Sequence, residues 1–202
     1  MKNVLIVSGH TNLQGDSFAN KIILEDLQAK LPNATFDFLD QEYPNFKIDV
    51  SVEQAKMEAA DIIVLQFPIF WYSMPSLMAK WMEDTFVHGW SHGSTGKALY
   101  GKKLLLSFTT GAPADMYVEG GIQMYPVETM TTRFQQMANL CGLVYEGYIY
   151  TGGVSYASRP DAEKVKIMEA ACHGKGFSCL YLLQFSSDLD YFLSSASFGA
   201  CL

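Results

Sequence analysis

Residues 61–67 read Asp-Ile-Ile-Val-Leu-Gln-Phe, and residues 68–75 continue with Pro-Ile-Phe-Trp-Tyr-Ser-Met-Pro. The first part is a continuous apolar run. Such a run is typical of a central strand in a parallel sheet, because helices cover both faces of that sheet. The stretch therefore predicts an α/β protein with a buried strand that leads directly into an aromatic loop.

On both sides of this segment, short apolar runs alternate with amphipathic stretches, which is the pattern of strand–helix–strand units. Further strands are expected at residues 3–8, 35–39, 103–110 and 143–151. Helices are expected at residues 17–30, 75–86 and 126–141, and from about residue 160. Five strands with four or more helices predict a flavodoxin-like, doubly wound parallel sheet with helices on both faces. We find no internal repeat and no linker, so residues 1–202 are expected to form a single domain.

The composition is that of an ordinary globular protein: 49% of the 202 residues are apolar and 17% are charged. The net charge of −7 argues against a nucleic-acid partner, because phosphate binding requires a basic surface. A membrane span is not expected, since no run of about 18 apolar residues occurs. The apolar run 4–7 is too short for a signal peptide, and four cysteines without paired spacing indicate cytoplasmic thiols.

The last part of the chain has an atypical composition. Residues 176–202 contain no lysine or arginine, although a C-terminal helix normally carries basic residues in its last turn. Two alternatives remain open: the tail folds against a partner subunit, or it is a partly disordered terminus.

In a doubly wound sheet, ligands bind beyond the carboxyl ends of the strands, where the strand order reverses. The first loop at that edge, residues 8–19, is rich in small and hydroxyl residues and leads into a helix N-terminus. Its free N–H groups, with His10, Thr11 and Ser17, form a candidate phosphate site. The alternative is that Asp16 or Ser17 only caps the helix. The glycine patterns of nucleoside-triphosphate and dinucleotide loops are both absent.

Two further loops leave the same edge. Residues 67–75 place three aromatic residues between two prolines, which offers a stiff apolar wall for a planar heterocycle; the alternative is a hydrophobic contact beneath the next helix or in a dimer. Residues 109–117 begin with Thr-Thr-Gly-Ala-Pro, where Gly111 permits close approach of a ligand and the threonine hydroxyls can donate hydrogen bonds. A phosphate seat, an aromatic plane and a polar edge together predict a flavin mononucleotide site.

These segments also resemble a known family. Phe-Pro-x-x-Trp-Tyr-x-Met-Pro at 67–75, Lys-Trp-Met-Glu at 80–83 and Thr-Thr-Gly at 109–111 are similar to the NAD(P)H:quinone oxidoreductases of flavodoxin-like fold. Phe-Val-His-Gly-Trp at 86–90 and Gly-Lys-Ala-Leu-x-Gly-Lys-Lys at 96–103 resemble the bacterial branch that includes the potassium-efflux ancillary oxidoreductases and the modulators of drug activity. The resemblance covers about residues 2 to 160.

The resemblance implies FMN, with FAD as an alternative, and places the flavin phosphate and ring on the loops described above. It also places Tyr117 near the ring edge, but residues 120–123 read Gly-Gly-Ile-Gln where the mammalian enzymes have a histidine. The candidate cofactor-binding residues are His10, Thr11, Ser17, Phe18, Ala19, Pro68, Ile69, Phe70, Trp71, Tyr72, Thr109, Thr110, Gly111, Ala112 and Tyr117.

The implied activity is that of an NAD(P)H dehydrogenase (quinone), of the EC 1.6.5 type, with NADH or NADPH as the reductant. A quinone-like acceptor would replace the oxidised nicotinamide on the same flavin face, which gives ping-pong kinetics. The candidate catalytic groups are Thr110 and Gly111, as donors to the reduced ring, and Tyr117, as a proton donor to the product. The alternatives are a flavodoxin-type electron carrier and a regulatory subunit of a membrane transporter.

Three further features have simpler interpretations. His88 and His92 lie four residues apart without other metal-ligand residues nearby, so no metal site is expected. The stripe of Leu77, Trp81, Met82 and Phe86 has helical spacing and indicates a core or dimer contact. Because residues 71–86 are so apolar, a homodimer that buries them is expected. Cys141 is expected to be buried and inert.

Overall fold

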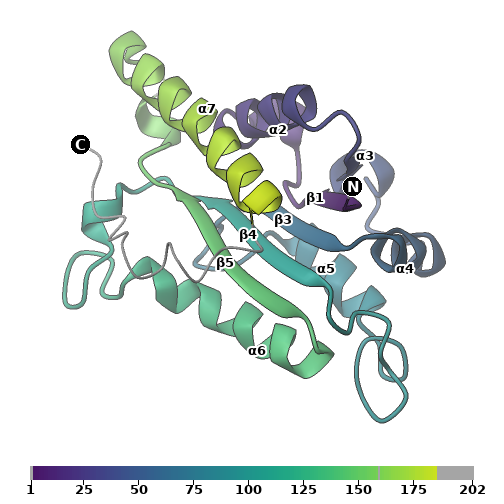
Figure 1. Ribbon diagram of the computed structural model, residues 1–202. Coiled ribbons are helices and arrows are strands. Elements are labelled where there is room, and N and C mark those ends of the chain that lie inside the picture. The colour runs from purple at the N-terminus through teal and green to yellow at the C-terminus, as the bar shows by residue number, and fades with distance from the viewer. Residues whose placement is uncertain (1, 159, 186–202) are drawn as a thin grey trace.

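The computed structural model describes residues 2–158 and 160–185 (Figure 1). Its strands form one five-stranded parallel sheet with the order β2-β1-β3-β4-β5. They are β1 Val4–Ser8, β2 Thr35–Phe38, β3 Ile62–Pro68, β4 Lys103–Thr109 and β5 Val144–Thr151. The predicted flavodoxin-like sheet is thereby confirmed, and each strand begins and ends within one residue of its expected bounds.

Helices cover both faces of the sheet (Figure 1). One face carries α1 Leu13–Asp16, α2 Ala19–Lys30 and α7 Ala162–Phe185. The other face carries α3 Leu39–Glu42, α4 Val50–Ala59, α5 Ser76–Thr85 and α6 Thr132–Cys141. Short 3₁₀ segments lie at η1 Ala114–Met116, η2 Val127–Thr131 and η3 Tyr156–Ser158. Within the described ranges, no helix combines the length and the apolar character needed to cross a membrane.

The core consists of two layers, because successive side chains of a strand point to opposite faces. In β1, Leu5 and Val7 belong to the core layer on the face that carries α3 to α6, whereas Ile6 belongs to the layer on the face that carries α2 and α7. In β3 all seven residues are buried, from Ile62 to Pro68. The continuous apolar run therefore reflects helices on both faces, as the sequence predicts.

Several helices differ from the expectations. The helix expected from residue 17 begins at Ala19, and the helix expected over 126–141 divides into η2 and α6. Helix α4 is not predicted by the apolar pattern, since only Glu53 and Met57 are buried in it. Of the atypical tail, residues 176–185 continue α7, and residues 186–202 lie outside the described residues. The single-domain organisation of the whole chain stays a prediction.

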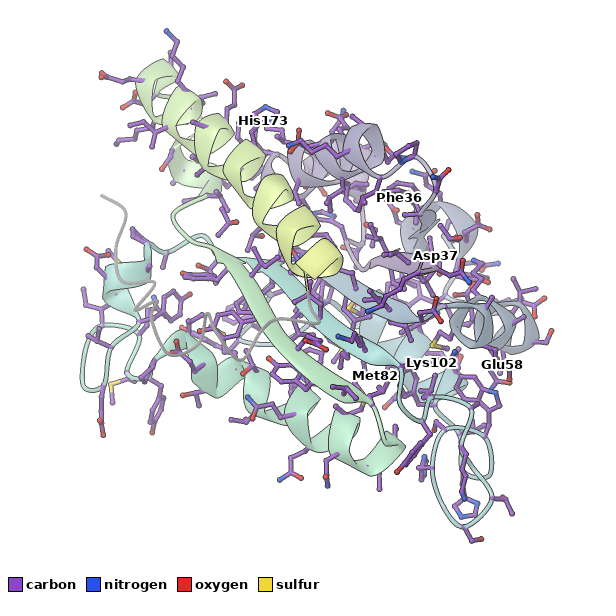
Figure 2. The ribbon with its side chains drawn as sticks, in the orientation of Figure 1. Phe36, Asp37, Glu58, Met82, Lys102 and His173 are labelled. Carbon is purple, nitrogen blue, oxygen red and sulfur yellow. The ribbon has the colours of Figure 1, made fainter. Side chains whose placement is uncertain are left out.

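A buried charged network explains why α4 packs despite its polar sequence. Glu53 is fully buried and accepts hydrogen bonds from the Tyr43 hydroxyl at 2.6 Å and from Trp81 Nε1 at 2.7 Å. Lys56 Nζ lies 2.7 Å from Glu53 Oε1 and 2.9 Å from Oδ1 of Asp37, at the end of the sheet where β2 lies (Figure 2). Polar contacts of this kind leave no periodic apolar signal in the sequence.

Candidate functional site

The carboxyl ends of β1, β3 and β4 meet at one edge of the sheet, and the strand order reverses between β1 and β3. Backbone hydrogen bonds join the loops that leave these strands: Gly9 N donates to Gln66 O at 2.9 Å, and Ile69 N donates to Thr109 O at 2.8 Å. The His10 and Phe70 rings form an edge contact with centroids 5.7 Å apart. All three loops predicted to carry the chemistry therefore lie together.

The first loop packs closely against α5 at Gly9 and leads into α2. A Cβ on Gly9 would lie 2.5 Å from Met78 Cε, so only glycine allows α5 to pack where β1 ends. His10 is buried, and its Nδ1 accepts from the Asn12 N–H at 3.0 Å. A neutral His10 ring therefore carries its proton on Nε2, the tautomer that can donate to an anion.

Ser17 supports the start of α2, because its hydroxyl accepts from the Lys21 N–H at 3.2 Å, but the N-cap residue is Phe18, which makes no side-chain cap bond. The Asp16 carboxylate accepts from the Asn12 side chain at 2.9 Å. The first N–H groups of a helix have no intrahelical acceptor, and here they belong to Ala19 and Asn20. The start of α2 thus retains donors that an anion can use.

The second loop is a tight aromatic turn. Phe70 and Ser73 exchange backbone hydrogen bonds of 2.9 and 3.0 Å, and the two residues between them, Trp71 and Tyr72, have φ values of +51° and +62°. Positive φ at both central residues is the type I′ geometry that usually requires Asn and Gly. The turn holds the Trp71 side chain 94% exposed. Strained backbone that exposes an indole to solvent makes this turn a candidate functional feature.

The third loop has a buried polar start and an open glycine. Thr109 accepts from Asn20 Nδ2 at 3.0 Å, and the Thr110 hydroxyl donates to Ala112 O at 2.8 Å and lies 2.8 Å from the Tyr150 hydroxyl. Gly111 is exposed, and a Cβ there would meet nothing closer than Ser155 Cα at 3.7 Å. The glycine is therefore not required by packing within the chain.

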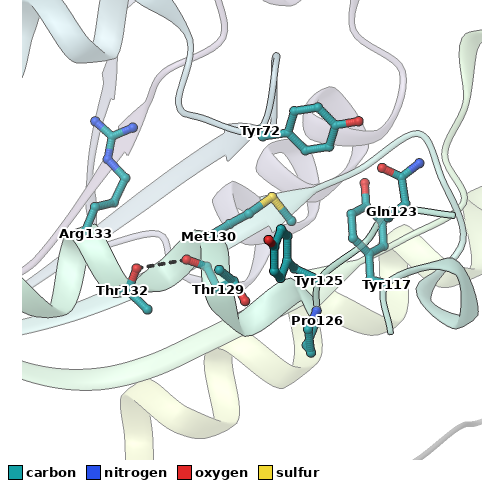
Figure 3. Close-up of a pocket in the computed structure, with 9 residues that line it drawn as sticks. All are labelled: Tyr72, Tyr117, Gln123, Tyr125, Pro126, Thr129, Met130, Thr132 and Arg133. Atoms are coloured by element: carbon teal, nitrogen blue, oxygen red, sulfur yellow. Dashed lines mark hydrogen bonds between the residues drawn. The ribbon is translucent and has the colours of Figure 1, made fainter. Parts of the chain in front are cut away.

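A cavity of about 240 Å³ opens between the aromatic turn and the segment that follows the third loop (Figure 3). Its lining residues are Tyr72, Tyr117, Gln123, Tyr125, Pro126, Thr129, Met130, Thr132 and Arg133. Of these, only Tyr72 and Tyr117 are among the candidates chosen from sequence. The others come from the loop before η2, from η2 itself and from the start of α6, and these segments carry no recognisable sequence motif.

The remaining predictions concern single side chains. Leu77 and Trp81 are fully buried in the core of this chain, so the apolar stripe on α5 does not itself require a dimer partner. His88 and His92 form an edge contact, and the described residues contain no cluster suited to a metal ion. Cys141 is buried, as expected, and burial raises the pKa of its thiol.

Comparison with known proteins identifies the family of this chain. Residues 2–173 match a protein family described as having a flavodoxin-like fold. An uncharacterized NAD(P)H oxidoreductase of Bacillus subtilis is 36% identical over 163 residues, which cover 81% of this chain and 92% of the relative. The ancillary protein KefF of the glutathione-regulated potassium-efflux system of Klebsiella pneumoniae is 38% identical over 140 residues, 69% of this chain and 77% of the relative.

A solved structure agrees with these relatives. The general stress protein 14 of Treponema denticola, crystallised in complex with FMN, is 29% identical, with a TM-score of 0.71 over 86% of this chain and 99% of that chain. The resemblance inferred from the loop motifs is confirmed by relatives that include an NAD(P)H oxidoreductase and a potassium-efflux ancillary protein. Because the family match spans nearly all of the described residues, this chain belongs to the flavodoxin-like family.

Proposed function

We propose that this protein is a flavin-dependent NAD(P)H oxidoreductase that binds FMN and reduces a quinone or a similar electrophile. One observation carries the proposal: the start of α2, the aromatic turn and the Thr109–Ala112 loop lie together where the strand order reverses. Relatives support it, since one is named an NAD(P)H oxidoreductase and a similar structure was crystallised with FMN. The corresponding activity is that of an NAD(P)H dehydrogenase (quinone).

The residues at the start of α2 fit a phosphate. The N–H groups of Ala19 and Asn20 face no helical acceptor, the helix dipole favours an anion, and the hydroxyls of Thr11 and Ser17 lie in the same loop. His10 contributes a donor through the tautomer that its bond to Asn12 selects. No lysine is needed for this seat, which suits a chain of net charge −7.

The two other loops fit the flavin ring. Pro68 to Tyr72 would form one side of the ring site, and Thr109 to Ala112 would form its polar edge. The Thr110 hydroxyl already donates to Ala112 O, so we assign the role of ring-edge donor to the Gly111 N–H. Thr110 would instead hold the conformation of this loop. Bound FMN would take a hydride from NAD(P)H and deliver it to the acceptor. Tyr117, at the edge of the cavity, is the candidate that protonates the product.

The exposed Trp71 indole offers a platform on which nicotinamide and acceptor would stack in turn. If they share that platform, they cannot bind together. Initial-rate plots at several quinone concentrations should then be parallel, and excess quinone should compete with the nicotinamide nucleotide. Intersecting lines would mean two separate sites and would contradict the shared platform.

The cofactor is tested by the absorption spectrum of the desalted protein after reconstitution. We expect one flavin per chain, and mass spectrometry of the heat-released cofactor should distinguish FMN from FAD. Oxidation of NADH and NADPH with and without quinone then measures the reaction and the preferred reductant. A flavodoxin-type carrier would bind flavin but would not turn over with nicotinamide, so a flavin-containing but inactive protein would favour that alternative.

We also propose a homodimer, on grounds that differ from the apolar stripe. Large apolar side chains are exposed in the aromatic turn and in the segment before η2: Trp71 at 94%, Ile122 at 80%, Tyr125 at 61% and Met124 at 56%. Exposed apolar side chains in such number indicate an interaction surface. Light scattering at micromolar concentration should give the mass of a dimer, and a monomeric mass would contradict the proposal.

One relative suggests a second candidate function. Because KefF is named an ancillary protein of a potassium-efflux system, this chain is also a candidate partner of a membrane transporter. Co-purification from membranes that contain such a transporter, with and without a W71A substitution, would test this. We expect this protein to co-purify with the membranes only when the transporter is present.

A further inference from the structure

The cavity beside the aromatic turn has a composition that points to a class of acceptor. Tyr72 is the second central residue of the turn and Tyr117 ends the third loop, so the cavity lies between two of the loops proposed to hold the ring (Figure 3). Tyr125, Pro126 and Met130 add aromatic and apolar surface. Walls of this kind suit a flat aromatic molecule, because tyrosine rings and a methionine thioether all pack well against a planar ring.

Arg133 contributes the cationic group of this lining. Its Nη1 donates to the Ser73 hydroxyl, which holds the guanidinium between α6 and the aromatic turn. The guanidinium also lies over the Phe134 ring, with Cζ 5.5 Å from the centroid. Both partners are neutral, so the positive charge at the cavity is held in position without being neutralised.

Within the part of the chain that the structure describes, Arg133 is not paired with a carboxylate, a property it shares with some of the lysines: Lys102, for example, donates to the backbone oxygens of Glu58 and Ala60. Other lysines are paired. Lys30, Lys56, Lys80, Lys103 and Lys164 each form an ion pair with a carboxylate. Among the described side chains no carboxylate forms such a pair with Arg133, although acidic residues outnumber basic ones by 21 to 14. The nearby Glu128 accepts from the Tyr148 hydroxyl and does not line the cavity.

We propose that the cavity selects aromatic acceptors that carry an anionic substituent, a carboxylate or a sulfonate, and that Arg133 is the residue that determines this specificity. This inference rests on the proposed oxidoreductase function and names its substrate class. The aromatic ring occupies the tyrosine-lined part of the cavity beside the flavin. The guanidinium, which has five N–H donors and uses one on Ser73, binds the anionic group through the others.

The test compares a matched pair of acceptors, 1,2-naphthoquinone-4-sulfonate and 1,2-naphthoquinone, with the flavin-loaded enzyme. The measured quantity is the ratio of kcat/KM for the anionic acceptor to kcat/KM for the neutral one. In R133Q this ratio should fall about tenfold, which is the effect of losing one favourable charge-assisted contact. In R133K it should fall less, because the charge remains and the forked geometry is lost.

S73A is the matched control, since it removes the hydrogen-bond partner of Arg133 and retains the cation. Its ratio should fall less than that of R133Q, because the cation remains beside the cavity although its hydrogen bond to Ser73 is lost. General damage to the turn would affect both acceptors alike. An unchanged ratio in R133Q would overturn the proposal. A raised KM for NADPH with an unchanged acceptor ratio would do the same, because Arg133 would then bind the nucleotide phosphate.

A binding measurement separates this inference from the proposed function. Titration calorimetry with 2-naphthalenesulfonate and 2-naphthalenemethanol uses ligands that cannot be reduced. The sulfonate should bind the unsubstituted protein more tightly than the alcohol, and R133Q should lose that preference. If neither quinone is reduced but the preference is present, the oxidoreductase function fails and the anionic aromatic site stands. If the two ligands bind equally, the site fails even when both quinones are reduced.

Discussion

Asn20 Nδ2 donates to Thr109 Oγ1 at 3.0 Å, although the two residues are 89 positions apart. The side-chain oxygen of Asn20, Oδ1, in turn accepts from Gln66 Nε2 at 2.7 Å, and all three side chains are buried. This chain of hydrogen bonds links the first turn of α2 to the carboxyl ends of β3 and β4. The Asn20 side-chain amide therefore fixes the start of α2, where the phosphate is proposed to bind, relative to the loop proposed to form the ring edge.

Replacing Asn20 by alanine should destabilise the fold. The substitution leaves the Gln66 amide without its acceptor and Thr109 without its donor in a buried site, which costs about 1–3 kcal/mol. Urea unfolding of N20A should therefore show a lower free energy of unfolding and weaker FMN binding. The control is N139A on the exposed face of α6; equal stability of the two variants would contradict this role.

Gly111→Val should abolish flavin binding while the fold survives. Since a Cβ at this position meets only Ser155 at ordinary contact distance, the protein itself has room for a side chain. The branched side chain would instead occupy the space where the ring edge is proposed. Flavin absorbance after desalting measures the effect, thermal melting checks the fold, and G111A should be intermediate. A G111V variant that retains flavin would mean that the ring lies elsewhere.

The double substitution W71N/Y72G should stabilise the fold and lower the rate of quinone turnover. A non-glycine residue with positive φ costs about 1–2 kcal/mol, whereas Asn-Gly is the preferred pair for a type I′ turn. Little burial is lost because Trp71 is 94% exposed and Tyr72 is 60% exposed. We expect a gain of about 1 kcal/mol in unfolding free energy with a clear loss of quinone turnover per bound flavin. Unchanged stability with unchanged turnover would remove the functional explanation for the strained turn.

The buried carboxyl of Asp37 should make stability depend on pH. Burial, together with a hydrogen bond to Glu53, raises its pKa to about 7. The unfolded chain releases this proton near pH 3.8, so the folded state binds more protons between these values. The Asp37 contribution therefore stabilises the fold at low pH and declines as pH rises from about 4 to 7.

D37N removes this titration and keeps an oxygen that can accept from Lys56. The free energy of unfolding of D37N, relative to the unsubstituted protein, should therefore increase between pH 5 and pH 7.5. The control is D84N, which removes a carboxylate from the more exposed pair with Lys80. A relative stability of D37N that is the same at both pH values would show that Asp37 does not hold its proton in the fold.

Much of the architecture could be predicted because it depends on local patterns. The unbroken apolar run of β3 requires cover on two faces, and Pro75, which is the N-cap residue, marks the start of α5. Helix α4 escaped prediction, since its buried residues include Glu53, which packs through Tyr43, Lys56 and Trp81. Trp81 lies on α5 and Tyr43 follows α3, so no local sequence pattern could reveal that Glu53 is a core residue.

By itself the sequence determined the fold and three loops with a shared chemistry, because strand and helix periodicities, prolines and glycines act over a few neighbouring residues. Only the tertiary structure decided that Asn20 binds Thr109, that Trp71 and Tyr72 form a strained turn, and that Arg133 reaches a tyrosine-lined cavity. The hydrogen bonds involved join residues 89 positions apart (Asn20 and Thr109) and 60 positions apart (Arg133 and Ser73), and the turn depends on backbone geometry. They form only when the sheet brings the carboxyl ends of its strands to one edge, and no local pattern records which side chains then meet.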